Sequence, residues 1–233
     1  MLLQNFSSKR DTLSLKAASI DQLSPTEALA VFRSRYRMYL LRDLINPGPQ
    51  LITAPDPLRA ALLLEREELP DEFDPKDYKV ECDDFDFSPS CRHVLIQTGG
   101  TLIAYFRILH ESAEKLIPFR SLYEVEYQKF RDTHPNARIA ELSRLIVLDA
   151  TQSKVLAEIG HADEVRLGKR LAMRLFQVMC QYAKKQGLSD IFAQTHPSHA
   201  PVYVRHFFNV IGAEKAYASM NNHPAVLLHY PVA

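Results

Sequence analysis

Two charged residues interrupt an apolar stretch, AELSRLIVL, that spans residues 140–148. Glu141 and Arg144 stand among residues of the kind that fill a strand buried on both faces. An ionised side chain in a low-dielectric interior is costly unless it has a charged partner or water. The stretch therefore predicts that oppositely charged side chains from elsewhere in the chain meet these two residues.

Other charged residues occur where they could supply these partners. The segment ECDDFD, residues 81–86, carries acidic residues around Phe85, and Arg107 lies near the end of the apolar run TLIAYFRIL. Guanidinium is the cation best suited to bidentate pairing with carboxylates. We therefore expect a balanced set of three acids and three arginines: Asp83, Asp86 and Glu141 with Arg35, Arg107 and Arg144. Such a set would either only attach an N-terminal helix and the acidic loop to a sheet, or form the wall of a polar substrate pocket.

The spacing of Glu141 and Arg144 adds a geometric expectation. Residues separated by an odd number point to opposite faces of a regular strand. A bulge between them would bring them toward a common side and splay the strand from its neighbour, leaving backbone N–H groups that a ligand could use.

A second group of charges lies on a helix expected from about residue 163 to residue 186. Arg166, Arg170 and Arg174 recur every four residues and so share one face. Gly168 and Lys169 stand beside them, and the start of such a helix is a ready anion site. This face is either a solubilising edge or a basic stripe for a phosphate or an acidic protein.

The elements that must position these residues follow from periodicity and turn signals. SPTE at residues 24–27 is a capping box that begins a helix, and Thr98-Gly99-Gly100 joins two strands in a hairpin. Gly187 ends the long helix as a C′ residue. The expected helices cover residues 24–42, 58–69, 118–131, 163–186 and 198–212, and the expected strands cover 93–97, 101–109, 140–148, 190–196, 214–220 and 225–231.

Composition limits the class of protein. The 28 Lys and Arg residues equal the 28 Asp and Glu residues in number, so the chain has no net positive charge that would attract nucleic acid. Three cysteines without CxxC spacing indicate neither a disulfide framework nor a zinc site, and we expect no metal. No stretch approaches the roughly 20 apolar residues of a membrane span, so we expect a cytoplasmic protein without integral membrane insertion. The length favours a single domain over residues 1–233, with residues 1–23 flexible or peripheral.

Four motifs resemble, in the same order, those of the acyl-carrier-protein-dependent branch of the GNAT-type N-acyltransferases. ECDDFD resembles its E-x-D-x-[FY]-D segment, and AYFRIL its G-x-x-R-L strand end, with Ala104 in the glycine place. AELSRLIV is similar to its E-[IVL]-S-R-[FL]-x-V strand, and Arg35 with Tyr39 matches the arginine and aromatic of its first helix. The branch contains acyl-homoserine-lactone synthases, N-acyl amino acid synthases and exosortase-associated acyltransferases.

The resemblance implies both a fold and a reaction. The fold is α/β (α+β), a GNAT-like three-layer sandwich with a mixed, mostly antiparallel central sheet, helices on both faces and a splayed or bulged central strand. The reaction moves a medium or long acyl chain from a thioester to the amino group of an amino acid or related amine, with no permanently bound cofactor. The implied substrate-binding residues are Arg35, Tyr39, Asp83, Phe85, Asp86, Arg107, Leu145 and Ile146.

Catalytic roles follow from the same resemblance. Backbone N–H groups near Ser143 to Ile146 would hold the oxyanion, and Arg144 lies among them. Glu141 would be the base, or would only orient the ammonium, because pairing with arginine makes a carboxylate a weaker base. Tyr203 is similar to the tyrosine that protonates the leaving thiolate in many GNAT enzymes, but is equally a candidate core residue. His196 and His199, which flank a turn, are expected to be local hydrogen-bonding residues.

The departures from the family pattern bear on the substrates. VRLGKR puts Arg170 where the coenzyme A loop of the fold, [QR]-x-x-G-x-[GA], has a small residue. A phosphopantetheine arm with one phosphate fits this better, so acyl-carrier protein is the expected donor and partner, and acyl-coenzyme A the less favoured one. The expected contacts are Arg166, Gly168, Lys169, Arg170 and Arg174. The absence of tryptophan disfavours S-adenosylmethionine as acceptor. A lactone synthase and a non-catalytic domain that binds acyl groups or carrier protein are the alternatives.

Overall fold

A computed structural model of the chain describes residues 13–40, 52–53, 56–112, 116–148 and 161–232. These residues belong to two compact units, one formed by residues 1–107 and 144–171 and the other by residues 108–143 and 172–233. Two strands and one helix pass from one unit into the other. They are β5 (Thr101–His110), β6 (Ile139–Val147) and α5 (His161–Gln186).

The first unit is built on an antiparallel β-structure. Strand β1 (Leu13–Ala18) pairs over its whole length with β4 (Cys91–Thr98). The β4–β5 turn has positive φ at Gly99 and Gly100, as the predicted hairpin requires. A small second sheet joins β2 (Ile52–Thr53) to β3 (Glu72–Phe73). Residues 13–18, part of the segment expected to be flexible or peripheral, therefore form a strand at one end of the strand order.

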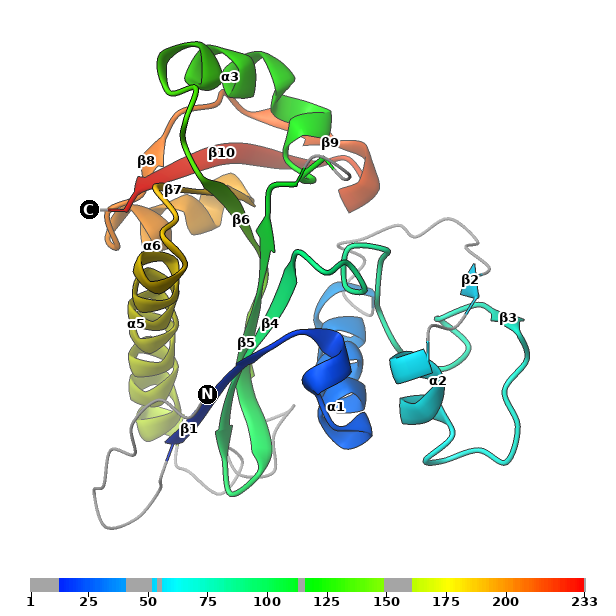
Figure 1. Ribbon diagram of the computed structural model, residues 1–233. Helices are drawn as coiled ribbons and strands as arrows, with labels where there is room; N and C mark the ends of the chain where they lie inside the picture. Colours follow the sequence, from blue (N-terminus) through cyan, green and yellow to red (C-terminus); the bar gives the residue numbers. More distant parts are fainter. Residues whose placement is uncertain (1–12, 41–51, 54–55, 113–115, 149–160, 233) are drawn as a thin grey trace. The chain divides into compact units, whose positions relative to one another are not determined.

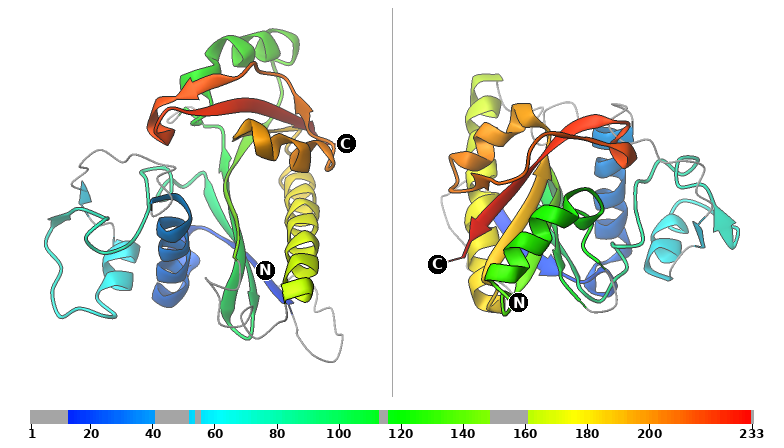
Figure 2. Two further views of the ribbon diagram at one scale, coloured as in Figure 1. Left: turned by 180° about the vertical axis from the view of Figure 1, so that it is seen from behind. Right: turned by 90° about the horizontal axis from the view of Figure 1, so that it is seen from above.

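Helices pack beside the hairpin in this unit. Helix α1 (Pro25–Arg35) lies between the β4–β5 hairpin and α2 (Asp56–Leu62) in the views of Figures 1 and 2. The predicted capping box is present: Ser24 Oγ accepts from Glu27 N–H and Glu27 Oε2 accepts from Ser24 N–H. A short 3₁₀ turn, η1 (Ile20–Gln22), precedes this helix. A π-helical turn, η2 (Tyr36–Leu40), follows Arg35 directly and carries Tyr39. Apolar side chains of α1, α2 and β6 share one core, to which Phe32, Leu58 and Ile146 belong.

The second unit is mixed. Strand β6 runs parallel to β7 (Asp190–Thr195), and β7 is antiparallel to β10 (His223–Pro231). Strand β10 also pairs with β8 (Asn209–Val210) and β9 (Lys215–Tyr217). Helices α3 (Arg120–Thr133) and α6 (Ala200–Val204) lie on opposite sides of the β7–β10 pair (Figures 1 and 2). Two 3₁₀ turns, η3 (Pro197–His199) and η4 (Ala218–Met220), complete the unit.

The fold is therefore mixed α/β with mostly antiparallel strands, as predicted. Gly187 follows α5 with φ 64°, which confirms its place as the C′ residue. The helix expected over residues 198–212 is wrong in length, since α6 ends at Val204 and β8 pairs with β10. Among the described helices, none is long and apolar enough to cross a membrane.

Candidate active site

Six charged residues of the first unit form a closed ring in which acidic and basic side chains alternate. Each carboxylate touches two guanidinium groups, and each guanidinium touches two carboxylates. Arg35 joins Glu81 to Asp86, both at 2.5 Å, and Arg107 joins Asp86 (2.9 Å) to Asp83 (2.5 Å). Arg144 closes the ring through Glu81 (3.0 Å) and Asp83 (3.2 Å). We call these six residues the charge ring.

Five of the six ring members were expected from the sequence, and Glu81 is the sixth. Glu81 holds two arginines, Arg35 and Arg144, and was not in the expected set. Its backbone N–H is bound to the carbonyl of Phe32, so the chain entering the ECDDFD segment is attached to α1. Glu81 is the first letter of the quoted motif, and that motif was the only signal in the sequence that could have found it.

The ring has a closed side and an open side. The side chains of Arg35 and Asp86 are fully buried, whereas those of Arg144 and Asp83 are 18% and 27% exposed. Burial by itself would raise the pKa of Asp86, but Arg35 and Arg107 outweigh it and hold that pKa well below its usual range. The same competition leaves the pKa of Asp83 lowered, with Arg107 as its main stabilising neighbour. Both acids are therefore ionised at neutral pH, and the ring as a whole is neutral.

The loop itself holds the carboxylates in place. Asp86 Oδ2 accepts from the backbone N–H of Asp83 at 2.8 Å, and Asp83 Oδ1 accepts from that of Phe85 at 3.0 Å. These local bonds are typical of aspartate in tight turns. The Arg107 guanidinium also lies 5.9 Å from the Phe85 ring centre, so the predicted Phe85 contributes a cation–π contact to the ring.

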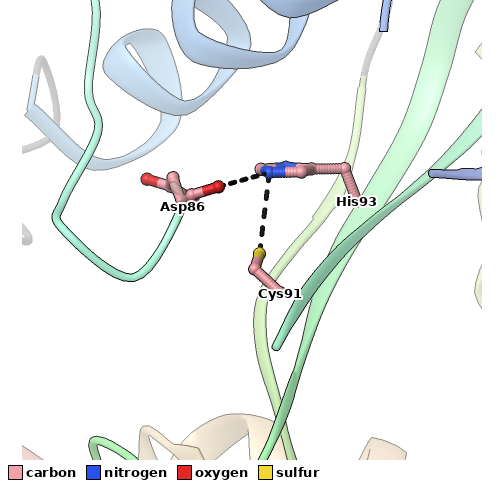
Figure 3. A group of neighbouring side chains, drawn as sticks. All are labelled: Asp86, Cys91 and His93. Atoms are coloured by element: carbon pink, nitrogen blue, oxygen red, sulfur yellow. Dashed lines mark hydrogen bonds between the residues drawn. The ribbon is translucent and has the colours of Figure 1, made fainter. Parts of the chain in front are cut away.

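A hydrogen-bonded layer supports the closed side. Figure 3 shows Asp86, Cys91 and His93, whose ligand-type atoms lie within 4.8 Å of one another. His93 Nε2 lies 3.1 Å from the backbone oxygen of Asp86, and its Nδ1 lies 2.9 Å from the Tyr105 hydroxyl. Because these nitrogens have partners and the Asp86 carboxylate faces two guanidinium groups, we assign this group to structural support rather than to a cation. Burial lowers the pKa of His93 to about 4, so the imidazole is neutral at pH 7.

Tyr39 connects the π-helical turn to the end of β6. Its hydroxyl donates to the backbone oxygen of Leu145 at 3.2 Å, and its ring lies 5.4 Å from the Arg144 guanidinium carbon. Burial raises the pKa of Tyr39 to about 12, so the hydroxyl keeps its proton. Ile146 is buried in the apolar core, which leaves its backbone as the group that could meet a substrate.

The strand that carries these residues is irregular where an irregularity was expected. Arg144 has φ 54°, in the left-handed region that a non-glycine residue seldom adopts. The parallel pairing of β6 with β7 extends from Ile139 to Leu142, before this point. Such a residue breaks the alternation of side chains, as in a bulge. This observation confirms the predicted break in regular strand geometry.

Glu141 is held within the second unit. Its side chain is buried, and Oε2 accepts from the backbone N–H of Phe119 at 2.8 Å, just before α3. Gln194 on β7 donates to the Phe119 backbone oxygen at 3.3 Å. The Phe119 ring stacks on Phe192 with a 4.7 Å centroid separation. Phe119 is thus held through its N–H, its carbonyl and its ring, and its N–H orients the Glu141 carboxylate.

The remaining expected residues have separate settings. Tyr203 lies on α6, with its ring against Phe176 and Phe208 at 5.2 and 5.4 Å. Arg174 lies on α5 and donates to Gln177 at 3.2 Å. Helix α5 begins at His161, so Gly168 stands in the helix interior rather than in the first turn.

His196 Nδ1 accepts from the Ser198 N–H at 3.2 Å, which confirms a local hydrogen-bonding role. Ser143 is partly buried at the end of the second unit's part of β6. The side chains of Arg166, Lys169 and Arg170 lie outside the described set.

The sequence and fold resemble known acyltransferases. A family model described as "N-acyl amino acid synthase FeeM" matches residues 30–163 and 161–231. Comparison with curated protein sequences returns no match. Among solved structures, FeeM, an N-acyl amino acid synthase from uncultured soil microbes, has a TM-score of 0.61 at 20% identity, covering 97% of this chain and 93% of that one.

Two further structures show the breadth of the fold. The acyl-homoserine-lactone synthase LasI gives a TM-score of 0.56 at 12% identity, over 96% of this chain and 91% of its own. An acyl-CoA N-acyltransferase from Pseudomonas aeruginosa gives 0.53 at 13% identity, over 94% and 99%. At these identities the likeness establishes the fold alone.

Proposed function

Because this chain belongs to the N-acyl amino acid synthase family and is an N-acyltransferase, we propose that it acylates an amino acid or related amine from acyl-carrier protein. The acyl group is of medium or long chain and arrives as a phosphopantetheine thioester. The amine nitrogen bonds to the thioester carbonyl carbon and the C–S bond breaks. The ammonium first loses one proton to give the amine. On amide formation the nitrogen loses a second proton and the departing thiolate gains one, so the products are an amide and the free carrier thiol.

The open side of the charge ring is the observation that carries this proposal. There the partly exposed carboxylate of Asp83 and guanidinium of Arg144 lie 3.2 Å apart. An α-amino acid bears an ammonium and a carboxylate on one carbon, so it could take Asp83 and Arg144 as partners for these two groups. The four buried ring members would hold this pair in place, because each open-side residue has a partner on the closed side. Rigid positioning of this kind favours acyl transfer by orienting the nucleophile.

The catalytic roles are assigned to strand β6 and helix α6. Glu141 accepts the ammonium proton, directly or through water, or orients the ammonium, and Phe119 N–H fixes its carboxylate. Backbone N–H groups from Ser143 to Ile146 stabilise the oxyanion, and the left-handed Arg144 aims this peptide segment away from regular pairing. Tyr203 protonates the thiolate, and its packing against Phe176 and Phe208 supports a fixed ring position.

The choice of donor rests on the sequence around Gly168. In the sequence pattern of the coenzyme A loop, Arg170 takes the place of a small residue, and this bulk disfavours a close approach of a pyrophosphate; in the structure residues 168–170 lie within α5. Arg166, Lys169 and Arg174 add positive charge suited to an acidic carrier protein. A carrier-protein donor places the reaction in the cytoplasm.

The test is a turnover assay with purified protein, acyl-carrier proteins of several chain lengths and single amino acids. Release of the carrier thiol together with an N-acyl amino acid detected by mass spectrometry is the expected result. Methylthioadenosine formed from S-adenosylmethionine would assign a lactone synthase instead. Equal turnover of acyl-coenzyme A would overturn the choice of donor, and binding of acyl-carrier protein without turnover would indicate a non-catalytic domain.

Variants at the open side sharpen this assay. Asp83→Asn and Arg144→Lys should raise KM for the amino acid about 10- to 100-fold, because each loses a hydrogen bond between charged groups. KM for the acyl donor should stay unchanged. Asp84→Asn is the matched control, since Asp84 is an exposed neighbour in the same loop. Equal effects of all three variants on the amino acid KM would refute the acceptor assignment.

A further inference from the structure

Phe207 combines two unfavourable features. It is the most exposed large apolar side chain of the described residues, at 79%. Its φ is 69°, a left-handed conformation in which a bulky residue is a rare outlier. An exposed aromatic ring on a left-handed backbone is a local conflict of the kind that is characteristic of functional positions.

The backbone explains why a left-handed residue is needed here. Phe208 N–H donates to the carbonyl of Tyr203, and Phe207 N–H donates to that of Val204. These two bonds form a Schellman motif that ends α6, in which Phe207 occupies the position where glycine is usual. Glycine would serve the motif without strain, so the motif does not explain the phenylalanine ring. Phe208 is buried and packs on Tyr203, which fixes the base of the turn.

Other apolar side chains accompany this ring. Val202, Val204, Val210 and Ile211 are each 40–52% exposed. They belong to α6, to β8 and to the residue after it, and α6 and β8 lie side by side (Figures 1 and 2). Exposed large apolar side chains gathered on two adjoining elements are characteristic of interaction sites. With Phe207, these residues form what we call the apolar tip.

The stretch of sequence that carries the apolar tip has fully charged side chains of one sign. From residue 197 to residue 213 the sequence has a single fully charged side chain, Arg205, and no acidic one. Arg205 is exposed and lies two residues before Phe207 in the sequence. His206 stacks on Phe176 with a centroid separation of 4.3 Å, which supports the turn from inside. An aromatic and aliphatic tip with a neighbouring arginine is the combination that binds the interface of a bilayer with anionic headgroups.

We propose that the apolar tip is a peripheral membrane contact, in which Phe207 enters the headgroup region and Arg205 pairs with an anionic lipid phosphate. Only the reason for such a contact rests on the proposed function: an acyl amino acid is an amphiphile, and it leaves the enzyme most readily into lipid. The contact itself follows from the exposure, conformation and charge of the tip. Its strength is that of one or two inserted side chains, so binding is weak and reversible.

Vesicle co-sedimentation tests the proposal without acyl donor or acceptor, so its outcome is independent of the enzymatic assignment. Wild-type protein should bind vesicles of phosphatidylcholine and phosphatidylglycerol at 3:1 more tightly than vesicles of phosphatidylcholine alone. Phe207→Ser should weaken binding to the mixed vesicles about tenfold, at the lower end of what burial of a phenylalanine contributes. Arg205→Gln should reduce the preference for anionic vesicles about fivefold.

Two further variants distinguish lipid binding from a folding defect or another occupant. Phe207→Gly should raise Tm, because it removes the left-handed strain, and should still lose vesicle binding. Val125→Ser is the matched control, since Val125 is 62% exposed on α3, away from the tip in sequence. Unchanged vesicle binding by Phe207→Gly, or no binding by the wild type, would overturn the proposal. A dimer seen by light scattering that Phe207→Gly dissociates would assign the tip to a second copy of the chain instead.

Discussion

The substitution Asp86→Asn tests whether the charge ring is a neutral, mutually dependent set. Asp86 is fully buried and accepts from Arg35 at 2.5 Å, from Arg107 at 2.9 Å and from the Asp83 backbone at 2.8 Å. Asparagine has nearly the same shape but no charge, so the variant leaves an excess guanidinium charge in a dry site. It also turns an amide N–H₂ or a weaker acceptor toward two cations.

Removing one partner of a buried ion pair costs about 3–5 kcal/mol, because the remaining charge stays desolvated. For a chain of this size, each kcal/mol lowers Tm by roughly 2–4 °C, so the expected loss is on the order of 6–20 °C. Thermal unfolding followed by circular dichroism measures it. Asp84→Asn removes an equal charge from the exposed neighbouring position and should change the unfolding free energy by less than about 0.5 kcal/mol.

The pH dependence gives a second arm. The pKa of Asp86 in the folded protein lies well below its ordinary value of 3.8, so below about pH 4 the unfolded chain binds the proton more readily. The stability that this group contributes is present above the ordinary value and is lost as pH falls toward the folded one. Asp86→Asn should therefore flatten the acid limb of the stability profile. If Asp86→Asn is as stable as Asp84→Asn, and the acid limb of its stability profile is the same as that of the wild type, the idea of mutual dependence is refuted.

Three further predictions concern His93, Glu141 and Tyr203. The folded pKa of His93, about 4, lies below its ordinary value of 6.5, so the wild type should lose on the order of 2–3 kcal/mol of stability as pH falls from 6.5 to 4. His93→Asn should lack this loss. If the unfolding free energies of the wild type and the variant, measured by urea denaturation, change equally with pH across that range, the prediction is contradicted. Glu141→Gln can still accept the Phe119 N–H, so Tm should hold while kcat falls about 10²- to 10⁴-fold; full activity would exclude Glu141 as the base. Tyr203→Phe keeps the ring packing against Phe176 but removes the hydroxyl, so kcat should fall about tenfold or more with donor KM unchanged, and a wild-type kcat would mark Tyr203 as a core residue.

The sequence by itself determined the local elements and most of the residues that form the charge ring. The capping box before α1, the glycine pair of the β4–β5 hairpin and Gly187 after α5 act through backbone conformation within a few residues, so their types reveal their places. The two charges inside an apolar strand announced that partners must exist, because burial without them is too costly. The motif order then indicated the family, which the match over most of the chain confirms.

Only the tertiary structure decided which charges meet. Arg35 reaches Glu81 across 46 residues and Arg144 reaches it across 63, distances in sequence over which no periodicity operates. The ring therefore closes through Glu81, while Glu141 is held by the peptide of Phe119. The same holds for β1, which pairs with β4, and for β8, which pairs with β10 within the stretch expected to be a helix over residues 198–212. Local chemistry specifies what a residue can do, and long-range packing selects the partner with which it does it.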